Sequence, residues 1–275
     1  MNEMQKKFLA AGAALVVLFL LWELWAAPFL LMNMDLRDQQ VSGGVQELWV
    51  FPEGEEGPYF VDVRQVETIV EEAPEKVVIN STYIEIDPLT GELSWGHEEI
   101  VAIGKATRMH TSGGDVERSG YAAFPLHVGK RDYEIWYRHL LGKGVWHFER
   151  ESVREGLPVY VFSYKVVSNA TKEYPEWAPH EVVVEDTGEM EVEPASGMVV
   201  NWVERWEGYV IKDGGRELID VWTGAFYRST IMARAGEAAE RKSFIFIVEW
   251  IVPAMLAGLA LLMGLLSRIA KEEAV

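Results

Sequence analysis

The sequence predicts a mainly β domain, built on an antiparallel sheet and flanked by N- and C-terminal transmembrane α-helices. Two long apolar runs, residues 8–32 and 244–266, lie near the ends of the chain, and short β-rich runs fill the middle. Charge follows the same division, because residues 33–243 carry 38 Asp and Glu against 21 Lys and Arg, which is −17 of the net −18. We therefore expect an acidic, extracytoplasmic domain anchored at both ends.

The first apolar run is predicted to be an uncleaved anchor over residues 8–32, preceded by a cytoplasmic segment, 1–7. A helix of this length, at about 1.5 Å per residue, covers the roughly 30 Å hydrocarbon core of a bilayer. A cleaved signal peptide ending at Ala26-Ala27 is the alternative. The run is long for a signal peptide, and Pro28 would directly follow the cut.

The second run, 244–266, is predicted to return the chain to the cytoplasm, where residues 267–275 form a tail. Lys6 and Lys7 precede the first span, which favours a cytoplasmic N-terminus. Both termini are then cytoplasmic, and the central domain is extracellular at the plasma membrane. Two candidate glycosylation triplets, at Asn80 and Asn169, lie in that domain and fit this placement.

Each apolar run contains one acid, Glu23 or Glu249, and an acid inside a bilayer is costly. Both lie beside tryptophans in the half of the span nearer the central domain, so one interpretation is an interfacial structural role. Ion or proton handling in a channel is the other.

Residues 33–46 are polar and contain glycines, which predicts a tether, and residues 47–216 are predicted to form the β-rich domain. Its expected strands are Leu48–Phe51, Tyr59–Val63, Lys76–Ile86, Glu98–Ile103, Tyr133–Tyr137, Pro158–Val167, Glu181–Glu185, Met198–Trp206 and Gly208–Lys212. In residues 217–243, apolar side chains recur at intervals near 3.6, which predicts an amphipathic helix before the second span.

Two segments of similar sequence, Glu85-Ile-Asp-Pro-Leu-Thr-Gly and Glu191-Val-Glu-Pro-Ala-Ser-Gly, predict hairpin turns. In each, Pro restricts φ, the hydroxyl can bond locally, and Gly can adopt positive φ. The similarity has two explanations: a duplication within the sheet, or independent use of a favourable turn.

The sequence contains no recognisable catalytic, cofactor or metal-binding constellation. It has no cysteine, and it lacks nucleophile-elbow, phosphate-loop and zinc-helix motifs. We therefore expect no enzymatic activity, no cofactor and no metal. The acidic domain also repels phosphate backbones, which argues against nucleic acid as a partner.

Aromatic side chains are frequent in the domain. They predict either a core of cross-strand aromatic pairs or an apolar groove for a lipid chain. The candidate ligand-binding residues are Tyr133, Trp136, Tyr137, Trp146, Trp202 and Trp206.

A family resemblance rests on Phe124-Pro-Leu-His-Val-Gly-Lys-Arg-Asp-Tyr-Glu-Ile-Trp, on Gly156-Leu-Pro-Val-Tyr-Val-Phe and on the turn Glu193–Gly197. These segments resemble uncharacterised two-pass proteins of actinobacteria and archaea labelled "PorA family porin". The resemblance implies a helix at each end and an envelope protein. Where an acid is expected after Trp136, this chain has Tyr137 and Arg138.

The function expected from these observations is a membrane-anchored cell-surface protein with a binding or envelope-organising role. Its partners would be the bilayer and either a lipid ligand or other envelope proteins. A porin-like channel is the alternative. Two helices from one chain cannot enclose a water-filled pore, so a channel requires a homo-oligomer.

Overall fold

The structure, a computed structural model, describes residues 3–34, 40–51, 54–137, 142–172 and 174–272. The chain divides into two compact units. One unit contains both ends of the chain, Met1–Asp35 and Glu240–Val275, and the other is the central Leu36–Ala239.

The terminal unit is helical. In chain order its elements are α1 (Glu3–Leu21), the π-helical turn η1 (Trp22–Ala26), α2 (Ala27–Met32), the last part of α3 (Arg228–Phe246), the π-helical turn η3 (Ile247–Ile251) and α4 (Val252–Glu272). Two continuous helices, Glu3–Met32 and Arg228–Ala270, are long and apolar enough to cross a membrane. The prediction of an apolar helix at each end is therefore confirmed.

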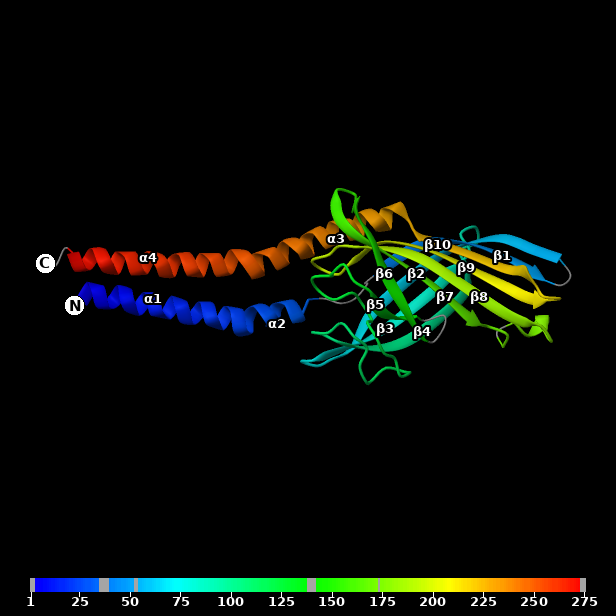
Figure 1. Cartoon of the computed structure of the whole chain (residues 1–275), viewed down its shortest axis with the longest axis horizontal. Coiled ribbons are helices and arrows are strands. Elements are labelled where there is room, and N and C mark those ends of the chain that lie inside the picture. The colour runs from blue at the N-terminus through cyan, green and yellow to red at the C-terminus, as the bar shows by residue number, and fades with distance from the viewer. Residues whose placement is uncertain (1–2, 35–39, 52–53, 138–141, 173, 273–275) are drawn as a thin grey trace. The chain divides into compact units, whose positions relative to one another are not determined.

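The two apolar helices pack side by side (Figure 1). The helices are in contact at Gly12, where an added Cβ would lie at an ordinary van der Waals distance of 3.5 Å from the Cβ of Met263. The π-helical turns of the two helices are also joined, because the indole of Trp22 donates a 2.9 Å hydrogen bond to the carbonyl of Val248. Small residues and interhelical hydrogen bonds are the usual contacts between helices in lipid.

The central unit is a ten-stranded antiparallel sheet, which confirms the predicted antiparallel β fold. Its strands are β1 (Gln40–Phe51), β2 (Gly54–Glu72), β3 (Lys76–Ile86), β4 (Leu93–Gly104), β5 (Tyr133–Tyr137), β6 (Gly142–Arg154), β7 (Leu157–Asn169), β8 (Glu181–Val192), β9 (Val199–Lys212) and β10 (Gly215–Phe226). The order is β4-β3-β2-β1-β10-β9-β8-β7-β6-β5. Two meanders therefore meet where the first strand pairs with the last.

The segment between β4 and β5, residues 105–132, connects the two edges of this sheet. Thr111 donates its backbone N–H to Ala102 of β4, and Tyr121 donates to Glu134 of β5. His110 and Gly120 are hydrogen-bonded to each other within the segment. Main-chain bonds of this kind cover edge strands that would otherwise invite pairing with another chain.

Apolar side chains pack against both faces of the sheet in separate clusters. The largest is formed by Phe124, Val128, Tyr133, Trp146, Phe162, Tyr164 and Val192. A second contains Tyr174 and Trp177, the latter in the short 3-10 helix η2 (Pro175–Trp177). On the opposite face from the largest cluster, the first part of α3 packs on Val159 and Val200 in a third.

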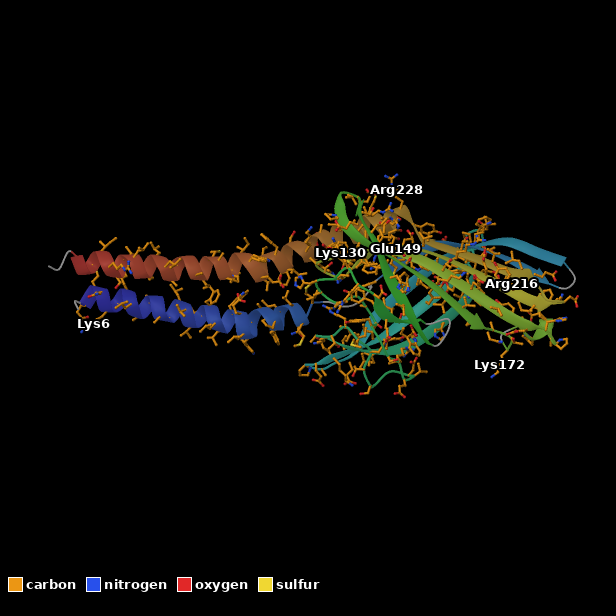
Figure 2. All side chains as sticks on the ribbon, in the orientation of Figure 1. Lys6, Lys130, Glu149, Lys172, Arg216 and Arg228 are labelled. Carbon is orange, nitrogen blue, oxygen red and sulfur yellow. The ribbon has the colours of Figure 1, made fainter. Side chains whose placement is uncertain are left out.

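The face on which α3 packs also carries exposed ion pairs. Glu185 there is paired with Lys165 at 2.7 Å and with Arg216 at 2.5 Å. In Figure 2 Arg216 lies on the β unit and Lys6 near the start of α1, while the apolar helices carry mainly carbon. Exposed ion pairs contribute at most about 1 kcal/mol each, so the buried clusters supply most of the stability.

Several predictions of strands and boundaries were wrong. No strand was predicted over β6, and the strands predicted at Met198–Trp206 and Gly208–Lys212 are one strand, β9. Strand β1 begins at Gln40, so the predicted tether 33–46 is partly strand. The helix predicted for 217–243 begins only at Arg228, because residues 215–226 form β10. A bulge between Leu218 and Asp220 shifts the strand alternation, so its apolar residues imitate a helical spacing.

Candidate functional site

The predicted aromatic residues lie in different parts of the β unit. Tyr133 and Trp146 face each other on β5 and β6 and are each 1% exposed. Trp202 makes an edge contact with Trp222 and a tilted contact with Phe226. These side chains therefore fill the interior and form no single surface.

The remaining predicted aromatics are also apart from one another. Trp206 packs beside Tyr174, with ring centroids 6.1 Å apart. Trp136 makes an edge contact with His110, whose pKa is lowered to about 4 by burial and by the nearby charge of Arg118. The side chain of Tyr137 lies outside the described part of the chain.

Buried acids accompany the interior aromatics. The Tyr164 hydroxyl lies 2.6 Å from Asp186 Oδ1 and 2.8 Å from Glu204 Oε1. A phenol donates one hydrogen bond, so both contacts are satisfied only when one carboxyl carries a proton. Gly188 makes room for the Tyr164 ring, because a Cβ at Gly188 would lie 2.3 Å from it. Asp186 and Glu204 are 1% and 4% exposed, so both acids lie inside the sheet.

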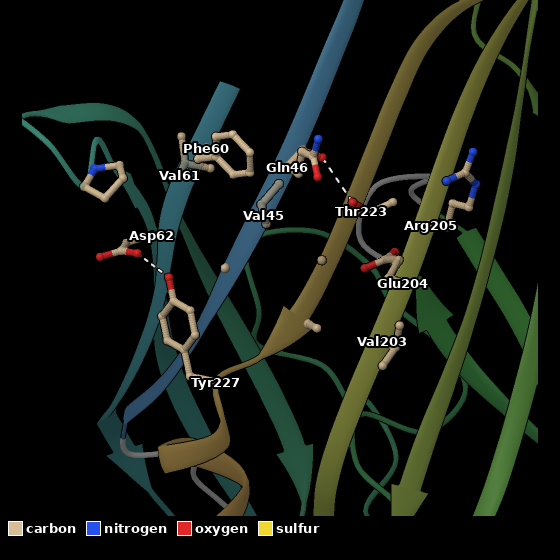
Figure 3. A pocket seen from close by; sticks show the side chains of 14 residues that line it. Val45, Gln46, Phe60, Val61, Asp62, Val203, Glu204, Arg205, Thr223 and Tyr227 are labelled. Carbon is tan, nitrogen blue, oxygen red and sulfur yellow. Dashed lines mark hydrogen bonds between the residues drawn. The ribbon is translucent and has the colours of Figure 1, made fainter. Parts of the chain in front are cut away.

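A groove with a volume of about 610 Å³ lies on the outer face of four adjacent strands, β2, β1, β10 and β9 (Figure 3). Gly44, Asp62, Ala225 and Val203 pair across these strands, so they face the same side. Gly44 and Ala225 are small and form a floor. The outward side chains of Phe60 and Val203 are 59% and 47% exposed, which leaves the groove apolar and open to solvent.

One end of the groove is closed by Tyr227, which lies between β10 and α3. Its ring covers Gly44, where a Cβ would lie only 2.9 Å from the ring. The Tyr227 hydroxyl donates a hydrogen bond to Asp62 Oδ1. Burial, and then this hydrogen bond, raises the pKa of Tyr227 to about 12, so the phenol stays protonated and Asp62 accepts.

Polar groups elsewhere in the groove are few. Arg205 of β9 projects from the lining, and its Nε donates to Glu207 Oε1 at 2.7 Å. Thr223 donates to the carbonyl of Gln46 at 3.4 Å, and Pro88 reaches the groove from the turn between β3 and β4. An apolar surface with polar groups at its ends suits an elongated apolar ligand better than a small charged one.

The sequence predicted none of these groove residues as a site. They come from segments far apart in the chain, and residues 44–46 were assigned to a tether. One usable signal was Gly44, because a glycine inside a strand indicates the close approach of another group.

The two acids of the apolar helices, Glu23 and Glu249, lie in matching positions. Each belongs to a five-residue π-helical turn, Trp22–Ala26 or Ile247–Ile251, and these turns are joined by the bond from Trp22 to Val248. Glu23 is exposed on the surface of the helix pair, and Glu249 is half-buried. A π turn releases a backbone carbonyl from the regular helical pattern, and such turns are frequent at functional sites.

The two glycosylation candidates differ in accessibility. Asn169 is exposed at the last position of β7, whereas Asn80 is half-buried in the middle of β3 and its Oδ1 is buried. Among the residues that the structure describes, no group of three or more His, Cys, Asp or Glu side chains could hold a metal ion.

Comparison with known proteins supports the resemblance seen in the sequence. The family model described as Porin PorA matches residues 61–268. No curated protein matches the chain. The match begins in β2, ends in α4, and so covers most of the sheet and the second apolar helix. Since it spans more than half of the chain, and apolar helices lie at both ends, this is a membrane protein that belongs to the Porin PorA family.

Proposed function

We propose that this protein is a non-enzymatic, membrane-anchored component of the cell envelope, and that its β domain binds the apolar chain of a lipid in the outer groove. In this proposal both termini are cytoplasmic and the domain is extracellular. The observation that carries it is the groove over β2, β1, β10 and β9, with its apolar floor and exposed Phe60 and Val203.

The size and composition of the groove support a lipid ligand. Ligand sites are mostly apolar, about 300–1,000 Å³ in volume, with a few polar groups that fix orientation. The groove has about 610 Å³ and places Asp62 at one end. The Tyr227 hydroxyl already donates its hydrogen to Asp62, so at this end of the groove the Tyr227 and Asp62 oxygens can only accept further hydrogen bonds. They therefore suit a head group that supplies hydroxyl or ammonium donors.

The exposed apolar residues of the groove also need an explanation. Phe60 and Val203 are exposed on the sheet face that also carries the ion pairs of Glu185, and exposed apolar surface of this kind is typical of a binding site. The groove lies where the chain enters and leaves the sheet, since Gly44 is near the start of β1 and Tyr227 directly follows β10. A ligand bound there would contact both strands that connect to the apolar helices.

The test uses the full-length protein in mild detergent and a lipid with a fluorescent acyl chain. We expect Val203→Trp to fill the groove and weaken binding by about tenfold, a loss of about 1.4 kcal/mol. Val167→Trp is the matched control, because Val167 is 55% exposed on β7 and does not line the groove. Equal binding by both variants, or an equal loss in both, would exclude the groove as the site.

An oligomeric channel is the second candidate function, and the observation that favours it is Glu23. An acid exposed on an apolar helix pair is costly in lipid, and a ring of subunits would give several Glu23 side chains a shared aqueous lining. Conductance of the purified protein in planar bilayers would test this. Conductance that disappears in Glu23→Leu would support the channel over the lipid-binding protein.

A further inference from the structure

The two glycosylation triplets offer a choice that the structure resolves. In Asn80-Ser81-Thr82 the acceptor is part of a central strand. Asn80 pairs with Thr68 of β2 on one side and with Ile100 of β4 on the other. Ser81 is 2% exposed, and its hydroxyl accepts a 3.1 Å hydrogen bond from Gln65. This triplet cannot leave the sheet without breaking hydrogen bonds to both neighbouring strands.

The triplet Asn169-Ala170-Thr171 lies at the end of a strand. Asn169 is the last residue of β7 and is exposed, and Nδ2 donates to Glu181 Oε1 at 2.9 Å. The backbone N–H of Thr171 donates to Asn169 Oδ1 at 3.1 Å, which turns the chain back at the acceptor. Figure 2 shows Lys172, which follows the triplet, projecting from the β unit.

This strand end is distant from the part of the sheet that packs under α3. Strand β7 begins at Leu157, in the cluster that packs under α3, and ends at Asn169. At about 3.3 Å per residue, this length places Asn169 about 40 Å along the sheet from that end. A bulky modification here would lie clear of the residues that pack under α3.

We propose that Asn169, and not Asn80, is an N-glycan acceptor in the folded protein. The donor class is a sugar joined to a lipid diphosphate, and the reaction requires an oligosaccharyltransferase of the host. The bond from Asn169 Nδ2 to the anomeric carbon forms, and the bond from that carbon to the diphosphate oxygen breaks. Nδ2 loses one proton, and the lipid diphosphate leaves. This inference depends on the extracellular placement in the proposed function, but not on lipid binding.

The experiment expresses the full chain in a host that N-glycosylates exported proteins and measures the intact mass of the purified, folded protein. We expect one glycan mass in the wild type, its complete loss in Asn169→Gln, and its retention in Asn80→Gln. Thr171→Ser keeps the hydroxyl that accepts the Val182 N–H at 3.0 Å, and should also keep the glycan.

A second glycosylation triplet, introduced as a control, distinguishes a wrong choice of acceptor from a wrong extracellular placement of the domain. Glu92→Asn completes a triplet with Ser94 in the exposed turn between β3 and β4. A glycan at this new site but none at Asn169 would overturn the choice of acceptor. A glycan on Asn80 in the folded protein would do the same. If neither Asn169 nor the new site is modified, the extracellular placement is wrong and the inference falls with it.

Discussion

The turns at residues 85–91 and 191–197 share a sequence pattern and a backbone geometry, but lie in very different surroundings. In the first, Gly91 donates its N–H to the carbonyl of Asp87 at 2.8 Å. In the second, Gly197 donates to Glu193 at 2.9 Å. The two glycines have φ values of 73° and 72°. The predicted hairpins are therefore confirmed, and each acid side chain accepts backbone hydrogen bonds inside its own turn.

What differs is the packing around each turn. Leu89, at the tip of the first turn, is 94% exposed, whereas Glu193 is 0% exposed. The second turn is covered by the segment before β5, where His127 donates its N–H to the carbonyl of Ala195 and Val128 donates to Pro194. Two similar local sequences thus form an exposed turn in one place and a buried, covered turn in the other. Local pattern determines the turn geometry, and tertiary contacts determine how much stability depends on it.

The largest difference in stability between the two turns is expected when each of their glycines is replaced by alanine. A Cβ at Gly197 would lie 2.3 Å from the carbonyl oxygen of Pro125, whereas a Cβ at Gly91 would meet nothing within 4 Å. Gly197→Ala should therefore cost about 4 kcal/mol in overpacking and backbone strain, and Gly91→Ala only about 1 kcal/mol from positive φ. Thermal unfolding followed by tryptophan fluorescence should show a midpoint lowered by about 10 °C in the first variant and a few degrees in the second. Equal shifts would mean that the covering segment does not restrain the second turn.

Replacement of the turn acids, Glu193 and Asp87, should give the next largest difference in stability. Glu193 Oε2 accepts hydrogen bonds from Ser196, from the backbone N at 2.7 Å and from the hydroxyl at 2.8 Å, inside a buried site. Glu193→Ala leaves both donors without their acceptor and should cost about 3 kcal/mol. Asp87→Ala removes bonds to the backbone of Leu89 and Thr90, but water can replace an exposed acceptor, so the loss should be clearly smaller. The same melting measurement compares the two variants. A larger effect at Asp87 would contradict the role assigned to burial.

Amide hydrogen exchange compares the two turns directly in the wild-type protein, with a smaller expected difference between them. The N–H groups of Gly91 and Gly197 make equivalent bonds, and only the second is covered. We expect exchange at Gly197 to be slower than at Gly91 by at least about tenfold, because a covered turn opens only with its neighbours. Similar exchange rates would show that the covering segment opens independently.

The smallest expected effect is the pH dependence of the exposed turn. Backbone hydrogen bonds from Leu89 and Thr90 lower the pKa of Asp87 below its ordinary value of 3.8. A carboxyl with a lowered folded-state pKa stabilises the protein above that ordinary value, and the contribution is lost as pH falls through the folded pKa. The gap in melting temperature between wild type and Asp87→Asn should therefore narrow below about pH 4. A constant gap would mean that the charge of Asp87 does not act on this turn.

The sequence predicted most of the local structure because that structure follows local patterns. Strand β3 and strand β5 were predicted with their observed ends, and so were the two hairpin turns. Strand β10 was mistaken for a helix, because a bulge shifts its alternation and its neighbours come from distant parts of the chain. The start of β1 was assigned to a tether, since its glycines were interpreted as flexibility when Gly44 instead admits the ring of Tyr227.

The groove could not be predicted for the same reason. Its floor exists only where β1 pairs with β10, a contact between residues such as Gly44 and Ala225 that are almost the whole domain apart in sequence. The aromatic residues chosen from the sequence are mostly interior, because clusters of aromatics more often fill a core than line a site. Exposed apolar residues on a charged face, such as Phe60 and Val203, carry the stronger signal, but exposure is visible only in the folded chain.

Native mass spectrometry of the full-length protein, released from mild detergent, distinguishes a lipid-binding protein from a channel. We expect a single subunit that carries one discrete lipid mass, with that mass reduced in Val203→Trp and retained in Val167→Trp. A defined ring of lipid-free subunits would contradict this expectation and would support an oligomeric channel, in which Glu23 and Glu249 become the residues to change next.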